Sequence, residues 1–149
     1  MIILIGKSIM KLACTYGAWR EYLSKSVIQT SDAPKAIGTY SQGIRLKNLV
    51  FTSGQIPINP KTGELIIGEF KAEVYQVLTN LDAVFKGGGS SLQSAVKLTI
   101  FLTDLSYFAQ VNEIFNSIFP KDPPARSAVQ VSALPMNARI EIEAIGYVE

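Results

Sequence analysis

The sequence contains no histidine and only one cysteine, Cys14, among its 149 residues. Without histidine the chain cannot build a Ser-His or Cys-His nucleophilic site or a His-ligated zinc site, and it lacks the usual general base for neutral pH. A single cysteine cannot form an intramolecular disulfide or a cysteine-based metal cluster, which is consistent with a reducing compartment. Any catalysis is therefore expected to rest on carboxylates, cations, amides and hydroxyls.

Long apolar runs and surplus positive charge are also scarce. The longest apolar run in the N-terminal segment is far shorter than the roughly 20 residues that span a bilayer. Residues 31–149 hold ten basic and eleven acidic side chains, a net charge of −1, although the whole chain carries +2. We therefore expect neither a membrane nor a nucleic acid as a partner, because a phosphate backbone attracts an excess of positive charge.

Residues 1–30 are interpreted as an N-terminal extension that is disordered or resembles a targeting segment. They hold four basic side chains against one acidic side chain. The segment lacks the basic start and the small-residue cleavage site of a secretory signal. We expect a cytoplasmic protein, with a mitochondrial location as the alternative if the extension is a transit peptide.

Residues 31–149 are predicted to form one domain, because apolar residues make up 48% of the chain and charged residues 17%. Apolar side chains recur at helical spacing over residues 70–85 and 108–119, which predicts two helices. A glycine run follows the first helix, and Asp104 or Ser106 can cap the second. Strands are predicted at 25–30, 40–46, 49–56, 95–102, 125–134 and 138–148, the second and third joined by a tight turn at Lys47-Asn48.

This order predicts an α+β domain in which a sheet carries two helices on one face. The strands at 49–56 and 95–102 are apolar on both alternating faces. Two helices cannot cover both faces of the sheet, so we expect the open face to be buried in an oligomer.

Charged side chains interrupt the last two strands. Alternation places Arg126, Ala128 and Gln130 on one side of their strand, where small neighbours leave room for a planar partner. A guanidinium binds a carboxylate through two parallel hydrogen bonds. Pairing with an acid of the fold is an equally ordinary role, and the residues alone leave both open.

Glu141 and Glu143 share one face of the last strand with Arg139. They are either solvated and partly paired to Arg139, or one of them lines a pocket and holds a water molecule. Asn112 lies beside an apolar helical stripe and needs hydrogen-bond partners within the fold or from a ligand. Tyr40 stands in a turn-rich segment, where it either packs in the core or closes a pocket. Ser53 and Gly54 stand at a strand end, and the glycine permits close approach of the backbone.

Four stretches of the sequence resemble one known family. They are "APKAIGTYSQG", "FTSGQIPINPKTGE", "FLTDL…FAQVNEIF" and "PPARSAVQVSALPMNARIEIEAI". Together they resemble the RidA/YjgF family, also called the reactive intermediate deaminase or L-PSP family. The resemblance implies a chorismate-mutase-like α+β protomer assembled as a homotrimer, with ligand clefts between subunits. It also implies a hydrolase that needs no cofactor and converts 2-imino or enamine acids, such as 2-iminobutanoate and 2-iminopropanoate, into 2-oxo acids and ammonia.

The resemblance also suggests a role for each candidate residue. Arg126 would bind the substrate carboxylate, and Glu141 would orient the attacking water and move protons. The other residues expected near the substrate are Tyr40, Ser53, Gly54, Asn112 and Ala128, where Ala128 stands at a position often occupied by cysteine in the family. Two alternatives remain: an endoribonuclease or translation inhibitor, and a trimer that binds small carboxylates without catalysis.

Overall fold

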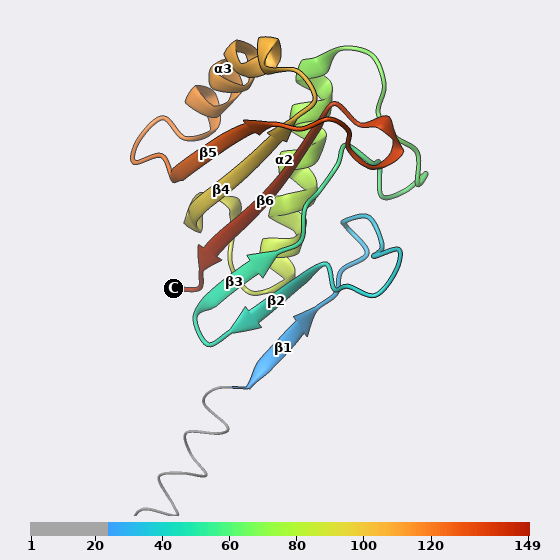
Figure 1. Cartoon of the computed structure of the whole chain (residues 1–149). Coiled ribbons are helices and arrows are strands. Elements are labelled where there is room, and N and C mark those ends of the chain that lie inside the picture. The colour runs from blue at the N-terminus through green and yellow to red at the C-terminus, as the bar shows by residue number, and fades with distance from the viewer. Residues whose placement is uncertain (1–23) are drawn as a thin grey trace, which may run out of the picture.

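The computed structural model describes residues 24–149, which form a six-stranded sheet with two long helices (Figure 1). In chain order the elements are β1 (Lys25–Ile28), β2 (Gly43–Leu46), β3 (Leu49–Thr52), α2 (Phe70–Gly87), η1 (Leu92–Ser94), β4 (Ala95–Leu102), η2 (Leu105–Tyr107), α3 (Phe108–Ile118), β5 (Ala125–Gln130), η3 (Pro135–Asn137) and β6 (Ile140–Tyr147). The predicted order of strands and helices is confirmed, as is the α+β class.

The strand order in the sheet is β1-β2-β3-β6-β4-β5, so the last strand of the chain lies in the middle. The β2–β3 hairpin turns at Lys47, whose φ of 56° suits a tight turn, as predicted. Strands β4 and β5 run parallel, and the other neighbouring pairs are antiparallel. The parallel pair needs a crossover connection, which α3 supplies.

Helix α2 buries its apolar stripe against one face of the sheet. Val74, Val77, Leu81 and Val84 are all fully buried, which confirms the predicted stripe. The sheet side of this core consists of alternate residues of β4 and β6 together with Val50 of β3, and it includes Leu98, Ile100, Leu102, Ile140 and Ile142. Helix α3 adds Val111, Ile114 and Phe115 to the same core.

The opposite face of the sheet is not covered by any helix in the described part of the chain. Phe51, Phe101 and Ile145 lie on it and are only partly buried. One further apolar side chain on this face, Val129, is paired with Phe101 and is 43% exposed. An apolar sheet face of this kind fits burial against another subunit, which remains a prediction.

A buried ion pair ties the start of β6 to the first turn of α2. Arg139 donates from Nε to both carboxylate oxygens of Glu73, at 3.1 and 3.2 Å, and from NH2 to Glu73 and to the carbonyl of Gly68. Glu73 is only 3% exposed. The pairing raises the pKa of Arg139 above its already high value. Arg139 is thus paired with α2, and the sequence-based alternative that paired it with the glutamates of its own strand is wrong.

The sheet begins at Lys25, inside the range that the sequence assigns to the N-terminal extension. The interpretation of that extension as disordered or targeting-like falls mainly on residues 1–23, which lie outside the described residues. Within residues 24–149, neither helix is long and apolar enough to cross a membrane.

Candidate active site

A cleft of about 720 Å³ lies where the end of β3, the loop after it and the first half of β6 meet the segment around Tyr40. Five of its lining residues are Tyr40, Ser53, Gly54, Glu141 and Glu143. We call this set the glutamate cleft. Four of the seven candidate residues therefore come together here, although they are far apart in the sequence.

Gly54 makes room for the Glu141 carboxylate. A Cβ atom at position 54 would lie 1.9 Å from Oε1 and 2.8 Å from Cδ of Glu141. The backbone at this point is fixed, because the next residue, Gln55, exchanges two hydrogen bonds with Ile142 of β6 at 2.9 and 3.0 Å. Only glycine at position 54 allows Glu141 to occupy its observed place.

The Glu141 carboxyl is half-buried and, within residues 24–149, forms no ion pair with a basic side chain. Burial raises its pKa above the ordinary value for glutamate, and the nearby Glu143 carboxylate raises it further. A carboxyl that is partly desolvated and has a raised pKa is suited to accept and return a proton.

Tyr40 and Ser53 line the same cleft but are bound differently. Tyr40 is 53% exposed, and its hydroxyl oxygen accepts a hydrogen bond from the backbone N–H of Ile37 at 3.2 Å. The Ser53 hydroxyl donates to the carbonyl of Ser41 at 2.6 Å. Tyr40 is not a core side chain, so the hypothesis that it packs in the core is wrong.

Arg126 and Ala128 lie elsewhere, on the edge strand β5, beside α3. The guanidinium donates from NH2 to Oδ1 of Asn112 at 2.6 Å, and it lies over the rings of Phe108 and Phe115 at 5.1 and 5.2 Å. Together with Leu105 and Phe108, Arg126 and Ala128 line an open hollow of about 380 Å³. We call Leu105, Phe108, Asn112, Arg126 and Ala128 the arginine corner.

No acidic side chain of the described residues pairs with Arg126. Partial burial lowers its pKa slightly from a value that is far above neutral, so the group stays charged. The hypothesis that Arg126 pairs with an acidic side chain of the fold is therefore wrong for the described part of the protomer. Asn112 accepts a hydrogen bond from the guanidinium and orients it. The position of Asn112 beside the apolar stripe did not reveal this role.

The glutamate cleft and the arginine corner lie on opposite faces of the sheet. Arg126 pairs with the buried Leu98, on the helix-covered side, whereas Glu141 pairs with Phe101, on the open side. Within one protomer Arg126 and Glu141 are separated by two strand spacings across the sheet, about 10 Å, and by three residues along the strands, a further distance of about 10 Å. A four-carbon acid is too short to contact both groups through the sheet.

Two residues of the glutamate cleft escaped the sequence-based choice of candidates. The sequence analysis expected one of Glu141 and Glu143 to line a pocket and chose Glu141 as the candidate, yet both residues line the cleft. Gln42 also lines it and is 4% exposed, with a fully hydrogen-bonded side chain amide. Gln42 lies within the predicted strand 40–46, and a single polar residue in a strand carries no pattern that distinguishes a buried amide from an exposed one.

Among residues 24–149, no group of three or more histidine, cysteine, aspartate or glutamate side chains is placed to hold a metal ion.

Comparison with known proteins adds information that the geometry alone lacks. The family model described as Endoribonuclease L-PSP matches residues 30–148. The chain is 45% identical over 121 residues to the rat protein named 2-iminobutanoate/2-iminopropanoate deaminase, covering 81% of this chain and 88% of the relative. It is 46% identical over 123 residues to Reactive Intermediate Deaminase A, chloroplastic, of Arabidopsis thaliana, covering 83% of this chain and 66% of the relative.

The fold is shared with solved structures as well. A crystal structure described as a putative endoribonuclease from Thermotoga maritima superposes with a TM-score of 0.82 at 48% sequence identity. The match covers 85% of this chain and 99% of that one.

Proposed function

The chain belongs to the L-PSP family, also called RidA/YjgF, and from this premise we propose that it hydrolyses 2-imino acids to 2-oxo acids and ammonia. The observation that carries the proposal is Arg126, a guanidinium at the surface that is held in place by Asn112 and has no acidic partner in the described residues. The rat relative at 45% identity is named for 2-iminobutanoate and 2-iminopropanoate, which are small acids with one carboxylate.

Arg126 is suited to bind the carboxylate of such a substrate. One N–H of NH2 is used by Asn112, which leaves Nε and NH1 as donors for a planar acceptor. The rings of Phe108 and Phe115 exclude water from part of the guanidinium, which strengthens its hydrogen bonds. Each charge-assisted hydrogen bond contributes about 1.5–3 kcal/mol to binding.

The complete site is proposed to lie between subunits of a homotrimer. Arg126 and Glu141 cannot meet one small substrate within a protomer, because the sheet separates them. A neighbouring subunit that packs on the open sheet face would bring its arginine corner to the glutamate cleft of the first. The partly buried aromatic side chains Phe51 and Phe101 on that face support such packing.

In the proposed reaction Glu141 handles the protons. Water attacks C2 of the imine, the C=N electron pair moves to nitrogen, and Glu141 accepts a proton from the water. Glu141 then returns that proton to nitrogen. Glu141 then takes the proton of the carbinolamine hydroxyl and passes it to the nitrogen. The oxygen forms the carbonyl group, the C–N bond breaks with its electron pair on nitrogen, and ammonia leaves. The raised pKa of Glu141 supports both transfers, since it brings the carboxyl closer to the pH at which it works.

The chemistry asks for positioning more than for activation. An imine is already electrophilic, so a water held near C2 reacts without a metal or a strong base. Arg126 also draws charge from the carboxylate next to the carbon under attack. This need for positioning fits a site built from one cation, one carboxyl and a glycine-lined wall.

A coupled assay with threonine dehydratase tests the proposal. We expect the protein to accelerate release of 2-oxobutanoate while consumption of threonine stays unchanged. Arg126→Ala should lower kcat/KM by about 10²–10⁴-fold, because two charge-assisted hydrogen bonds are lost. Arg45→Ala is the matched control, since Arg45 binds the backbone carbonyls of Lys47 and Gly88, away from both surfaces.

Two outcomes would contradict the proposal. A folded Arg126→Ala variant with full activity would remove Arg126 from the reaction. A wild-type protein that binds 2-oxobutanoate but does not accelerate its release would be a carboxylate-binding protein without catalysis. RNA cleavage by purified protein, lost in Arg126→Ala, would instead favour the endoribonuclease alternative.

A further inference from the structure

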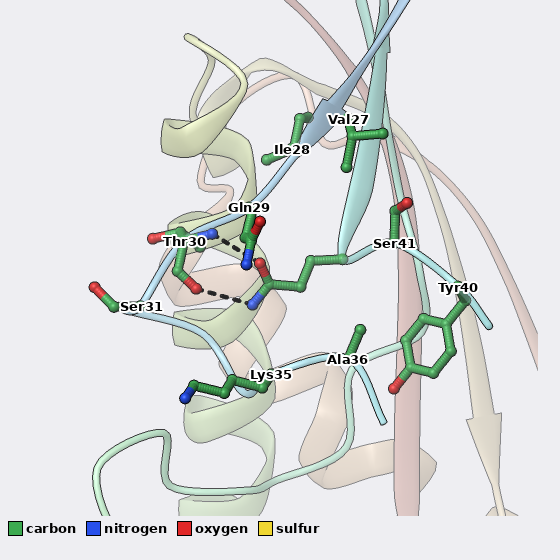
Figure 2. Close-up of a pocket in the computed structure, with 10 residues that line it drawn as sticks. Val27, Ile28, Gln29, Thr30, Ser31, Lys35, Ala36, Tyr40 and Ser41 are labelled. Carbon is green, nitrogen blue, oxygen red and sulfur yellow. Dashed lines mark hydrogen bonds between the residues drawn. The ribbon is translucent and has the colours of Figure 1, made fainter. Parts of the chain in front are cut away.

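The segment from Thr30 to Tyr40 forms one wall of the glutamate cleft. It contains neither helix nor strand, and it includes Gly38 with a φ of +121° and Ile37 with 80% of its surface exposed. The same segment also lines a second hollow of about 410 Å³ (Figure 2), which shares Lys35, Tyr40 and Gln42 with the cleft. Tyr40 therefore borders both hollows.

Within residues 24–149, one buried amide, that of Gln42, makes the hydrogen bonds that hold this wall to the rest of the domain. The Oε1 atom of Gln42 accepts the backbone N–H of Thr30 at 2.7 Å. Its Nε2 atom donates to the carbonyls of Thr30, Ala33 and Pro34 at 3.0, 3.2 and 2.8 Å. Figure 2 shows the two contacts with Thr30 as dashed lines.

The other hydrogen bonds of the segment are local. They run from the backbone of Asp32 to the Thr30 hydroxyl and from the backbone of Ile37 to the Tyr40 hydroxyl. Within residues 24–149, the Gln42 amide thus makes all the hydrogen bonds that join residues 30–40 to a different segment. Its loss would free the wall without breaking the sheet.

The backbone that carries Gln42 is firmly held. Its carbonyl accepts the N–H of Ser53 at 2.9 Å, so it connects directly to the floor of the glutamate cleft. A Cβ atom on the next residue, Gly43, would lie 2.8 Å from Val84 of α2 and 2.9 Å from the carbonyl of Phe51. Gln42 therefore stands on a tightly packed base and supplies the hydrogen bonds of the wall, which is also anchored by packing of the buried Ala33 in the core.

We propose that Gln42 is a positioning residue that sets the Tyr40 wall over the glutamate cleft, and that its effect on substrate use passes through Tyr40. The inference rests on the proposed function for its kinetic consequence, although the attachment itself is independent of any activity. Gln42 does not contact the reacting atoms, since its amide is fully occupied by the backbone of residues 30–34. Its contribution is to fix where Tyr40 stands relative to Glu141.

The first test measures how firmly residues 31–40 are held in the absence of substrate. Gln42→Met keeps the length and volume of the side chain and removes its four hydrogen bonds. We expect faster hydrogen exchange at residues 31–40 and faster trypsin cleavage after the exposed Lys35. Leu92→Ala, which removes a buried side chain of η1, is the control matched in Tm, and it should leave exchange at residues 31–40 unchanged.

The second test separates positioning from stability. In the coupled imine assay, Gln42→Met should raise KM by about 10- to 100-fold, as expected for a misplaced binding group, with a smaller change in kcat. In a Tyr40→Ala background the same substitution should have no further effect on KM, because the two residues act as one unit. Gln42→Glu keeps the acceptor for Thr30 but loses the donors, so it reports on the donors if Gln42→Met does not fold.

Each failure has a distinct reading. If exchange and trypsin cleavage stay at wild-type rates in Gln42→Met and Gln42→Glu, or if the effects of Gln42→Met and Tyr40→Ala on KM simply add, the positioning role is wrong. If the wild-type protein lacks imine hydrolysis, the proposed function fails, while the two substrate-free measurements still decide the attachment. In that case the affinity for 2-oxobutanoate replaces KM in the Tyr40→Ala comparison.

Discussion

Replacing Gly54 by alanine is the sharpest perturbation that the structure offers, because it adds one methyl group against the Glu141 carboxyl. The new Cβ would lie 1.9 Å from Oε1, 2.8 Å from Cδ and 3.0 Å from Cγ of Glu141. Non-bonded heavy atoms prefer separations of about 3.5–4.0 Å, so the overlap with Oε1 exceeds 1 Å by a rough estimate. The backbone cannot retreat, since Gln55 is hydrogen-bonded to Ile142 on β6. Glu141 must therefore leave its place.

Gly54→Ala is expected to lower kcat. A positioned acid–base group contributes about 10²–10⁴-fold to rate, so Gly54→Ala should lower kcat by at least about 10²-fold. KM should change less, because Arg126 lies on the opposite face of the sheet and is not disturbed. Stability should change little, by about 1 kcal/mol or less, since a half-buried Glu141 can turn towards solvent. The coupled threonine dehydratase assay and a thermal melt measure the two effects separately.

Gly63→Ala serves as the matched control. Gly63 has a φ of +74°, which strains an alanine, but nothing lies within 4 Å of the added Cβ. This variant should lose about 1 kcal/mol of stability and keep wild-type kcat. A folded Gly54→Ala protein with wild-type kcat would refute the reasoning, because it would show that Glu141 is not needed where the structure places it.

Three further predictions concern charged side chains. Burial raises the pKa of Glu141 in the folded state, so the Glu141 carboxyl contributes favourably to stability at acidic pH, and this contribution is lost as the pH rises through the folded-state pKa. Glu141→Gln should therefore raise Tm at pH 7, while the activity falls. Glu143→Gln removes a charge that raises the pKa of Glu141, so the acidic limb of the kcat/KM profile should move to lower pH; an unchanged limb would argue against Glu141 as the titrating group. Arg139→Ala leaves the buried Glu73 unpaired and should cost about 3 kcal/mol of unfolding free energy by urea titration, and a loss below 1 kcal/mol would contradict the importance of this pair.

The periodic patterns of the sequence were sufficient for the elements and the class of the fold. The stripe from Phe70 to Phe85 specifies α2 because it recurs at helical spacing, and the β-branched run at 95–102 coincides with β4. Asp104 accepts the N–H of Ser106 at 2.7 Å and so caps η2, whereas the sequence predicted that it caps the helix at 108–119; α3 itself has Tyr107 at its N-cap position and no side-chain cap. These features depend on neighbours within a few residues, which the sequence displays directly.

The order of the strands could not be predicted in the same way. Strand β6 pairs with β3 and β4, which precede it by about 90 and 40 residues in the printed sequence. Such pairings depend on which faces of the sheet are buried, and alternation leaves several orders equally acceptable. The partner of Arg139 was misjudged for this reason, since Glu73 lies 66 residues away on α2.

The candidate site, like the fold, could be predicted from the sequence only in part. Arg126 and Glu141 stand out because charges are costly in apolar strands unless they are partnered or functional. The sequence could not predict that Arg126 and Glu141 lie on opposite faces of the sheet. Alternation along a strand shows which residues of that strand share a face, but not which face of the sheet it is. The role of Asn112 as a ligand of the Arg126 guanidinium also depends on the packing of α3 beside β5.

The central claim is that Arg126 of one subunit and Glu141 of another form one site, and mixing two inactive variants tests it most directly. Arg126→Ala and Glu141→Gln chains, unfolded together at equal concentrations and refolded, should assemble at random. In a trimer with one site at each interface, about a quarter of the sites would then hold both intact residues, so about a quarter of the wild-type activity should return. Mixed assemblies that form but remain as inactive as their parents would contradict a site shared between subunits.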